Sequence, residues 1–139
     1  MAPGKLSRRT SVIAAVLFGG LALFEAALAA GVPWGRAAWG GGQAELGAGL
    51  RISSAVSVML WSLAALVVLR RGGHTTWSPL PDRWLRVAVW VLAGYSILGV
   101  LVNLASRSSI ERALMAPFSL ALATCCAIVA LWGTVPQRA

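Results

Sequence analysis

The sequence predicts an all-α protein: an integral membrane bundle of four transmembrane helices. Hydrophobic residues make up 58% of the 139 residues and charged residues only 12%, which is more apolar surface than a soluble domain of this size can bury. The apolar residues are gathered in four runs, at residues 12–31, 50–70, 84–104 and 112–133. Each run has the roughly 20 residues that an α-helix needs to cross a hydrocarbon core of about 30 Å. The connections are short, so residues 1–139 form one domain.

The first run contains a carboxylate, Glu25, in an otherwise apolar segment. An ionisable side chain inside a membrane span costs a few kcal/mol, roughly 2.5–3.5 for the more expensive charges, and therefore usually has a partner or a function. Small residues also recur along this run at a spacing of four and three. They form a seam that lets another helix approach closely, in a homo-oligomer or with a partner membrane protein. The seam consists of Ala15, Gly19, Ala22, Ala26 and Ala29.

The start of the chain has a second interpretation. Arg8 and Arg9 before an apolar run are similar to a twin-arginine export signal, and residues 27–29 (Ala-Leu-Ala) are similar to a cleavage site. Glu25 lies just before that site, where small neutral residues are expected. We therefore expect a retained helix.

The segment at residues 32–49 is predicted to be an external loop. It is rich in glycine and too long for a tight turn, and Trp34 and Trp39 flank Arg36. Such a loop can lie at the membrane interface with its tryptophans among the lipid headgroups, or it can act as a lid over an external pocket.

The second and third apolar runs carry polar stripes. Ser54, Ser57 and Trp61 share one side of the second run, and Tyr95 and Asn103 lie close together around the third. We expect these stripes to face the bundle interior and to form hydrogen bonds between helices.

The fourth run is preceded by a helix-start signal. Ser108 and Glu111 have the spacing of a capping box, which predicts the beginning of helix four. Pro117 follows about two turns later, and a proline inside a helix predicts a kink.

The net charge of +8 is distributed unevenly between the two predicted sides. The N-terminus, the predicted cytoplasmic loop at residues 71–83 with its flanks, and the C-terminus carry eight basic residues: Lys5, Arg8, Arg9, Arg70, Arg71, Arg83, Arg86 and Arg138. The other side carries four: Arg36, Arg51, Arg107 and Arg112. This bias predicts an N-in/C-in orientation in a bacterial cytoplasmic (inner) membrane. It indicates the lipid bilayer, and no nucleic acid, as the partner of the basic residues.

The sequence predicts no metal site and no cofactor. Cys125 and Cys126 are neighbours in one helix and point about 100° apart, which makes a poor disulfide or metal pair. His74 is the single histidine, so one chain cannot supply a bis-histidine haem site.

The predicted topology gives each residue a depth in the membrane, and most polar groups outside the cytoplasmic loop then lie in the external half of the bundle. The predicted binding residues there are Glu25, Arg51, Ser54, Tyr95, Asn103, Arg107 and Glu111. They can form a polar pocket that faces outward. They can equally form a structural network, with Glu25 paired to Arg51 and with Asn103 bound to Arg107 or Glu111.

Two resemblances add to these observations. The segment from Gly19 to Glu25 (GGLALFE) resembles the first helix of the small multidrug-resistance exporters, which implies a proton-coupled transporter with Glu25 as the coupling residue and an antiparallel dimer. Span three lacks the glycine-rich signature of that family. The whole chain, with eleven arginines and one lysine, resembles uncharacterised four-span membrane proteins of similar length from high-GC bacteria. That likeness implies no activity.

Three functions are consistent with these sequence features. The first is a non-enzymatic accessory or ligand-binding membrane component with a polar site in the external half. The second is a membrane-embedded isomerase or cyclase that acts on a lipid-like substrate, with Glu25 as the acid or base and Asn103 or Tyr95 orienting the substrate. The third is a small proton-coupled transporter that uses Glu25. The first is favoured because the sequence offers no nucleophile beside a base.

Overall fold

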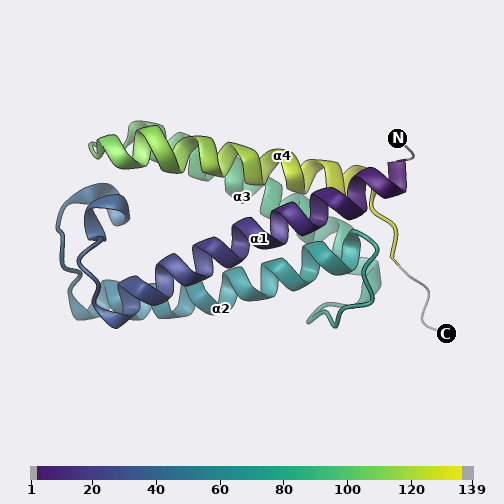
Figure 1. The fold of residues 1–139 in the computed structure, drawn as a ribbon, viewed down its shortest axis with the longest axis horizontal. Coiled ribbons are helices and arrows are strands. Elements are labelled where there is room, and N and C mark those ends of the chain that lie inside the picture. The colour runs from purple at the N-terminus through teal and green to yellow at the C-terminus, as the bar shows by residue number, and fades with distance from the viewer. Residues whose placement is uncertain (1–2, 136–139) are drawn as a thin grey trace.

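The computed structural model describes residues 3–135 and confirms the all-α fold class, with four long helices and no strand in that part of the chain (Figure 1). The helices are α1 (Pro3–Ala30), α2 (Ala48–Arg71), α3 (Leu85–Ala105) and α4 (Ala116–Trp132). Single helical turns occur at Gly35–Ala37 (η1), Trp39–Gly41 (η2), Asp82–Trp84 (η3) and Glu111–Met115 (η4). The predicted and observed helices overlap along nearly their full lengths.

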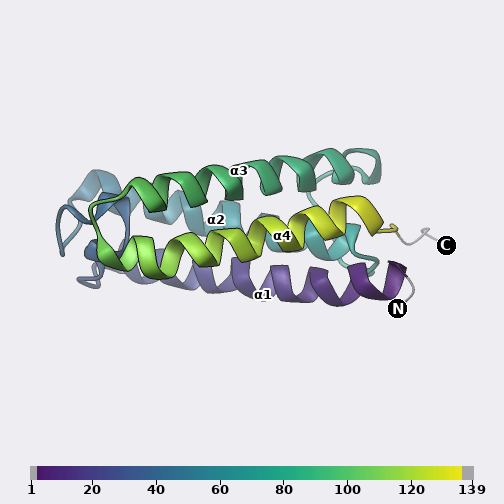
Figure 2. The ribbon, with the colours of Figure 1, turned by 90° about the horizontal axis from the view of Figure 1, so that it is seen from above.

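The four helices run up and down as two closely packed pairs (Figures 1 and 2). Helix α1 packs along α2, and α3 packs along α4. The α1–α4 contact joins the two pairs, whereas α2 and α3 touch less. We call the end that holds residues 31–47 and 106–110 the loop end. The opposite end, where α1 begins and α4 ends, is the terminal end.

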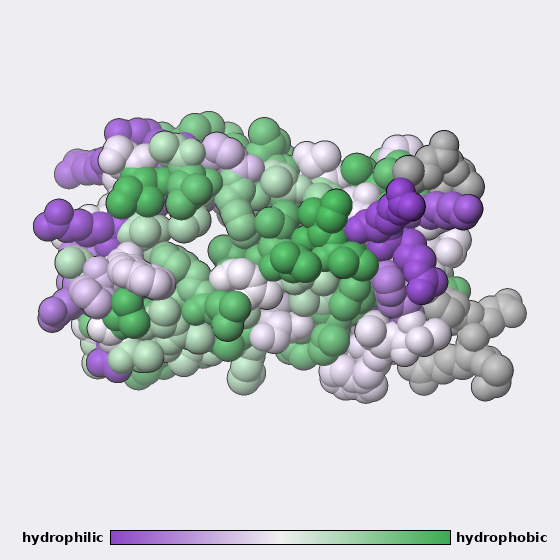
Figure 3. Space-filling model, in the orientation of Figure 1, coloured by the Kyte–Doolittle hydropathy of each residue, from purple (hydrophilic) through white to green (hydrophobic). Residues whose placement is uncertain are grey.

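All four helices are long and apolar enough to cross a membrane, with mean hydropathies of 2.1 to 2.2 over their most apolar windows. Large apolar side chains remain exposed along each of them, including Leu23 at 74%, Ile52 at 66% and Val91 at 64%. Figure 3 shows an apolar middle between two hydrophilic ends. This distribution is that of a multi-pass membrane protein, because lipid tails are a good solvent for such a surface.

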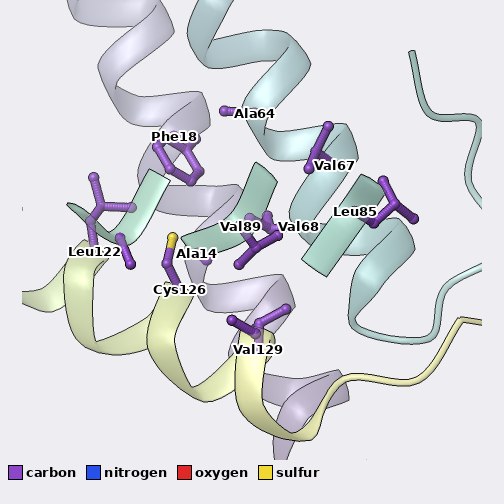
Figure 4. Packing of buried hydrophobic residues seen from close by; sticks show 12 residues of the cluster. Ala14, Phe18, Ala64, Val67, Val68, Leu85, Val89, Leu122, Cys126 and Val129 are labelled. Carbon is purple, nitrogen blue, oxygen red and sulfur yellow. The ribbon is translucent and has the colours of Figure 1, made fainter. Parts of the chain in front are cut away.

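A close-packed apolar core fills the terminal half of the bundle (Figure 4). Phe18 from α1, Val68 from α2, Val89 from α3 and Val129 from α4 are each 0% exposed. Val89 lies near the beginning of α3, and Val68 and Val129 lie near the ends of α2 and α4, so antiparallel packing brings these three to one level, while Phe18 lies in the middle of α1. The core includes Cys126, a buried free thiol that packs as a small apolar side chain.

The small-residue seam of α1 lies only partly in this packing. Ala22 is buried and Ala15 packs against the core, but Ala26 is exposed. A Cβ added at Gly19 would meet no atom within 4 Å. Helix α1 instead packs through a different face, on which Ser11, Ala14 and Phe18 are each 0% exposed, so the seam is not what holds α1 within its own bundle.

An ion pair closes the terminal end between α2 and α3. Arg70 donates from Nε and Nη2 to the two carboxylate oxygens of Asp82, at 3.1 and 2.9 Å. The Arg70 side chain is only 5% exposed, whereas that of Asp82 is 38% exposed. The bidentate geometry fixes η3, the turn that precedes α3, against the last turn of α2.

The beginning of the fourth helix differs from the prediction. The Glu111 amide donates to Ser108 Oγ at 3.3 Å, as expected for a capping box. The Glu111 carboxylate does not reach back to the Ser108 amide, which donates instead to Ser106 Oγ. A π-helical turn follows at Glu111–Met115 and continues directly into α4, in which Pro117 is the second residue and supplies no backbone N–H.

Candidate functional site

A cavity of about 660 Å³ occupies the loop half of the bundle. All four helices and η2 of the loop contribute to its lining. Its size lies in the range of small-molecule sites, roughly 300–1,000 Å³. On the face shown in Figure 3, the surface is also hollowed on the loop-half side of the apolar middle. We call this space the loop-half cavity.

The cavity brings together two carboxylates from different helices. Glu25 comes from α1, and Glu111 comes from the π-helical turn before α4. Sequence reasoning placed Glu111 in a loop beyond the membrane spans, but its side chain is buried, with the residue 4% exposed. Residues 3–135 contribute no lysine, arginine or histidine to the lining. The lining is therefore acidic.

Glu25 has one carboxylate oxygen, Oε2, that is buried without a hydrogen-bond partner. The carboxylate lies beside the hydroxyl of Ser54, which is itself fully buried on α2. Ser54 Oγ accepts a hydrogen bond from the indole Nε1 of Trp39 at 3.2 Å. A polar chain thus runs from Glu25 through Ser54 to the loop.

The predicted Glu25–Arg51 ion pair is wrong. Arg51 is exposed, and its Nε donates to the carbonyl of Ala29 at 2.9 Å, at the C-terminal end of α1. Gly31, with φ +97°, turns the chain there, and a Cβ at that position would lie 3.3 Å from the Arg51 guanidinium carbon. Because the last carbonyls of a helix attract cations, Arg51 caps α1 and stays out of the cavity.

Glu111 holds the loop. Its Oε1 accepts a hydrogen bond from the Gly40 amide at 3.0 Å. Ser108 Oγ donates to the carbonyl of Arg36 at 2.7 Å, a second attachment close by. Trp39, Gly40 and Gly41 all have positive φ angles (54°, 82° and 68°), a tight conformation that glycine tolerates and tryptophan rarely adopts. The loop at residues 32–47 is therefore docked over the cavity.

The polar residues of α3 differ in their partners: Asn103 meets α4, Tyr95 contacts Trp61 of α2, and Ser96 donates to the Leu92 carbonyl of its own helix. Asn103 Nδ2 donates to Ser119 Oγ at 3.2 Å, so the predicted contacts of Asn103 with Arg107 or Glu111 are wrong. Arg107 is exposed and does not line the cavity. Tyr95 lines the cavity, although its side chain is also 57% exposed.

Aromatic rings form much of the remaining wall. Trp61 contacts two other rings: its ring centroid lies 5.8 Å from that of Phe18 and 5.6 Å from that of Tyr95. The Trp61 Nε1 is buried without a hydrogen-bond partner. The aromatic lining residues are Phe24, Trp39, Trp61, Tyr95 and Phe118.

Of the seven predicted binding residues, the structure brings Glu25, Tyr95, Asn103 and Glu111 to the cavity, with Ser54 directly behind Glu25. Arg51 and Arg107 lie elsewhere. Sequence reasoning missed Phe24, Phe118 and Ser119, which have no pattern that distinguishes them from lipid-facing residues. Trp61 was placed on a polar stripe but not in a site. Its position on the same side of the helix as Ser54 and Ser57 was the available signal.

Within residues 3–135, no group of three or more histidine, cysteine, aspartate or glutamate side chains lies close enough to hold a metal ion. Comparison with protein-family models, with curated proteins and with solved structures finds no match to this chain. Support for a function therefore comes from the geometry of the site itself.

Proposed function

We propose that this chain is a non-enzymatic, ligand-binding protein of the membrane, and that its loop-half cavity takes a small lipophilic organic cation. The observation that supports this most strongly is the lining: two carboxylates, five aromatic side chains and, within residues 3–135, no basic group. Aromatic faces attract cations within about 6 Å, and they do so more strongly when water is excluded.

The unpartnered oxygen of Glu25 gives this proposal its anchor. A buried charge is costly unless it is paired, and Arg51, the nearest basic residue on the facing helix α2, is bound to the end of α1. A cationic ligand in the cavity, beside the Glu25 carboxylate, supplies the missing charge. The Trp61, Tyr95 and Phe24 rings then cover its apolar groups.

The proposal predicts discrimination by charge at constant size. Tetraphenylphosphonium and tetraphenylborate have nearly the same shape and opposite charge. We expect purified protein in neutral detergent to bind the phosphonium at least tenfold more tightly than the borate in equilibrium dialysis. Equal binding of the two ions would contradict the proposal.

Glu25→Gln should weaken phosphonium binding at least tenfold, because the amide keeps the shape but removes the charge. The matched control is Glu45→Gln, which neutralises an exposed loop carboxylate outside the cavity. The same loss in both variants would show that only overall charge matters. In proteoliposomes, a binding protein retains the probe without concentrating it, whereas accumulation driven by a proton gradient would favour the transporter alternative.

We further propose that the terminal end faces the cytoplasm of a bacterial inner membrane, so that the cavity lies in the external half. The basic residues support this orientation: the described part of the chain carries seven of them near the terminal end, at positions 5, 8, 9, 70, 71, 83 and 86, and four near the loop end. Arg138 lies outside the described residues.

The orientation is testable by cysteine labelling in a Cys125→Ala, Cys126→Ala background. Gly42→Cys and Arg107→Cys should react with an impermeant maleimide added outside intact cells, and Thr75→Cys only after lysis. All three native residues are exposed. Labelling of Thr75→Cys in intact cells would show that the topology is opposite to the one proposed.

A further inference from the structure

A second cavity, of about 360 Å³, lies at the terminal end, far from the carboxylates of the loop half. It is lined by Lys5, Arg8, Arg9 and Val12 of α1 and by His74, which follows α2. We propose that this basic pocket binds the phosphate headgroup of an anionic membrane phospholipid.

The pocket is fixed by contacts between α1 and the loop after α2. His74 Nε2 donates to the carbonyl of Arg8 at 3.2 Å, and Arg8 Nη1 donates to the carbonyl of Gly73 at 3.4 Å. The loop backbone is itself held, since the His74 amide donates to the carbonyl of Leu69 at 3.1 Å. These contacts hold the loop against α1 beside a preformed space, which the basic side chains line mainly with their hydrocarbon stems, and the remaining N–H groups of Arg8 stay available to an anion.

The positive charge of the pocket is not compensated by nearby acids. The sequence has four acidic residues, and three of them (Glu25, Glu45 and Glu111) belong to the loop half. The fourth, Asp82, is bound to Arg70. Lys5, Arg8 and Arg9 are exposed. An anion is the ligand that this charge distribution favours.

The surroundings favour a lipid over a free anion. Positions 5, 8, 9 and 12 share one face of α1, so Val12 lies one turn below the charged groups on the side of the membrane middle. Val12, Ile13 and Val16 are 43%, 54% and 68% exposed and extend the apolar surface downward. When the lipid phosphate lies among the basic groups, its acyl chains can therefore lie along this apolar surface toward the middle of the membrane. Juxtamembrane basic residues contribute about 1 kcal/mol each to binding anionic lipid.

The test is native mass spectrometry of the full chain in neutral detergent with phosphatidylglycerol or phosphatidylcholine added. Wild type should retain phosphatidylglycerol preferentially. Lys5→Gln/Arg9→Gln should lower that retention roughly tenfold or more, because two cationic contacts are lost. The matched control, Arg83→Gln/Arg86→Gln, removes two exposed charges from the same end but outside the pocket, and should bind like wild type.

Three results would overturn the proposal. The first is equal retention of the two lipids by wild type. The second is an equal loss in both double variants, which would show general charge attraction. The third is stabilisation by inorganic phosphate equal to that by short-chain phosphatidylglycerol, which would show a free-anion site. The charge-conserving Lys5→Arg/Arg9→Lys variant tests whether substitution at these two positions disturbs the fold, and it should keep the lipid preference. None of these outcomes depends on the ligand of the loop-half cavity.

Discussion

The two halves of this bundle are built differently from the same four helices. The terminal half is filled by apolar side chains that are 0–5% exposed, and its buried charge, Arg70, is paired with Asp82. The loop half contains a cavity, two carboxylates and two buried polar atoms without partners, Glu25 Oε2 and Trp61 Nε1. Trp61 is at the boundary, because it stacks on Phe18 of the core and also lines the cavity.

In this fold, the half that is packed most closely is not the half that holds the candidate binding site. Helix association in lipid depends on close packing and on satisfied hydrogen bonds. The terminal half meets the first condition through its apolar core, although Ser7 Oγ, Arg71 Nε and Thr76 Oγ1 are buried without partners at its end, outside that core. The loop half leaves a carboxylate oxygen unpaired beside a cavity, and such sites are typical of binding regions supported by a rigid frame elsewhere. Four predictions test this division, from the largest expected effect on stability to the smallest.

Phe18→Ala should cause the largest loss of stability, about 3–5 kcal/mol, because it leaves a hole in the packed half and removes the stacking partner of Trp61. Unfolding in detergent, followed by circular dichroism, measures the loss. Leu23→Ala on the same helix is the control, since Leu23 is 74% exposed. A similar cost for both variants would mean that the terminal core is not the main source of stability.

Asp82→Asn should cost less than Phe18→Ala, because it removes the carboxylate that accepts two hydrogen bonds from the Arg70 guanidinium, while Asp82 itself is partly exposed. The double variant Asp82→Asn, Arg70→Met should recover part of this loss, since the guanidinium is removed as well. The same unfolding assay reports it. Additive losses would show that the two side chains act independently.

Glu25→Gln should change stability by less than about 0.5 kcal/mol, although it should weaken cation binding at least tenfold. The reason is that Glu25 contacts no basic partner and one of its oxygens is unpaired. In a double-mutant cycle with Arg51→Gln, the two effects should add, with no coupling energy. Recovery of stability in the double variant would show that Glu25 and Arg51 form an ion pair, which is absent from the structure.

Gly19→Leu should be nearly neutral for the single chain, because an added Cβ meets no atom within 4 Å. The unfolding midpoint of the monomer should stay within error of wild type. If a second helix uses the small-residue seam from outside, the same change should lower the dimer fraction in cross-linking. A large destabilisation of the monomer would place the seam inside the bundle.

Much of the fold was predictable because lipid imposes strong rules on sequence. Four apolar runs predicted four helices within a few residues of their observed ends, except that α1 extends back to Pro3, well before its apolar run begins. The pairing of polar groups was not predictable. Arg51 was expected to bind Glu25 because both lie near one level, yet it binds the Ala29 carbonyl instead. Depth along the chain gives the level of a side chain but not its direction around the helix.

The sequence by itself determined that this chain is a four-helix membrane protein with an isolated carboxylate in its first span, because hydrophobic length and the cost of buried charge are local properties. Tertiary structure alone decided that Glu111 faces the same cavity as Glu25, and that η2 of the loop binds Glu111 through Gly40 and binds Ser54, beside Glu25, through Trp39. Those contacts join residues up to 71 positions apart. They depend on how the α1–α2 and α3–α4 pairs meet, a choice that no local pattern encodes.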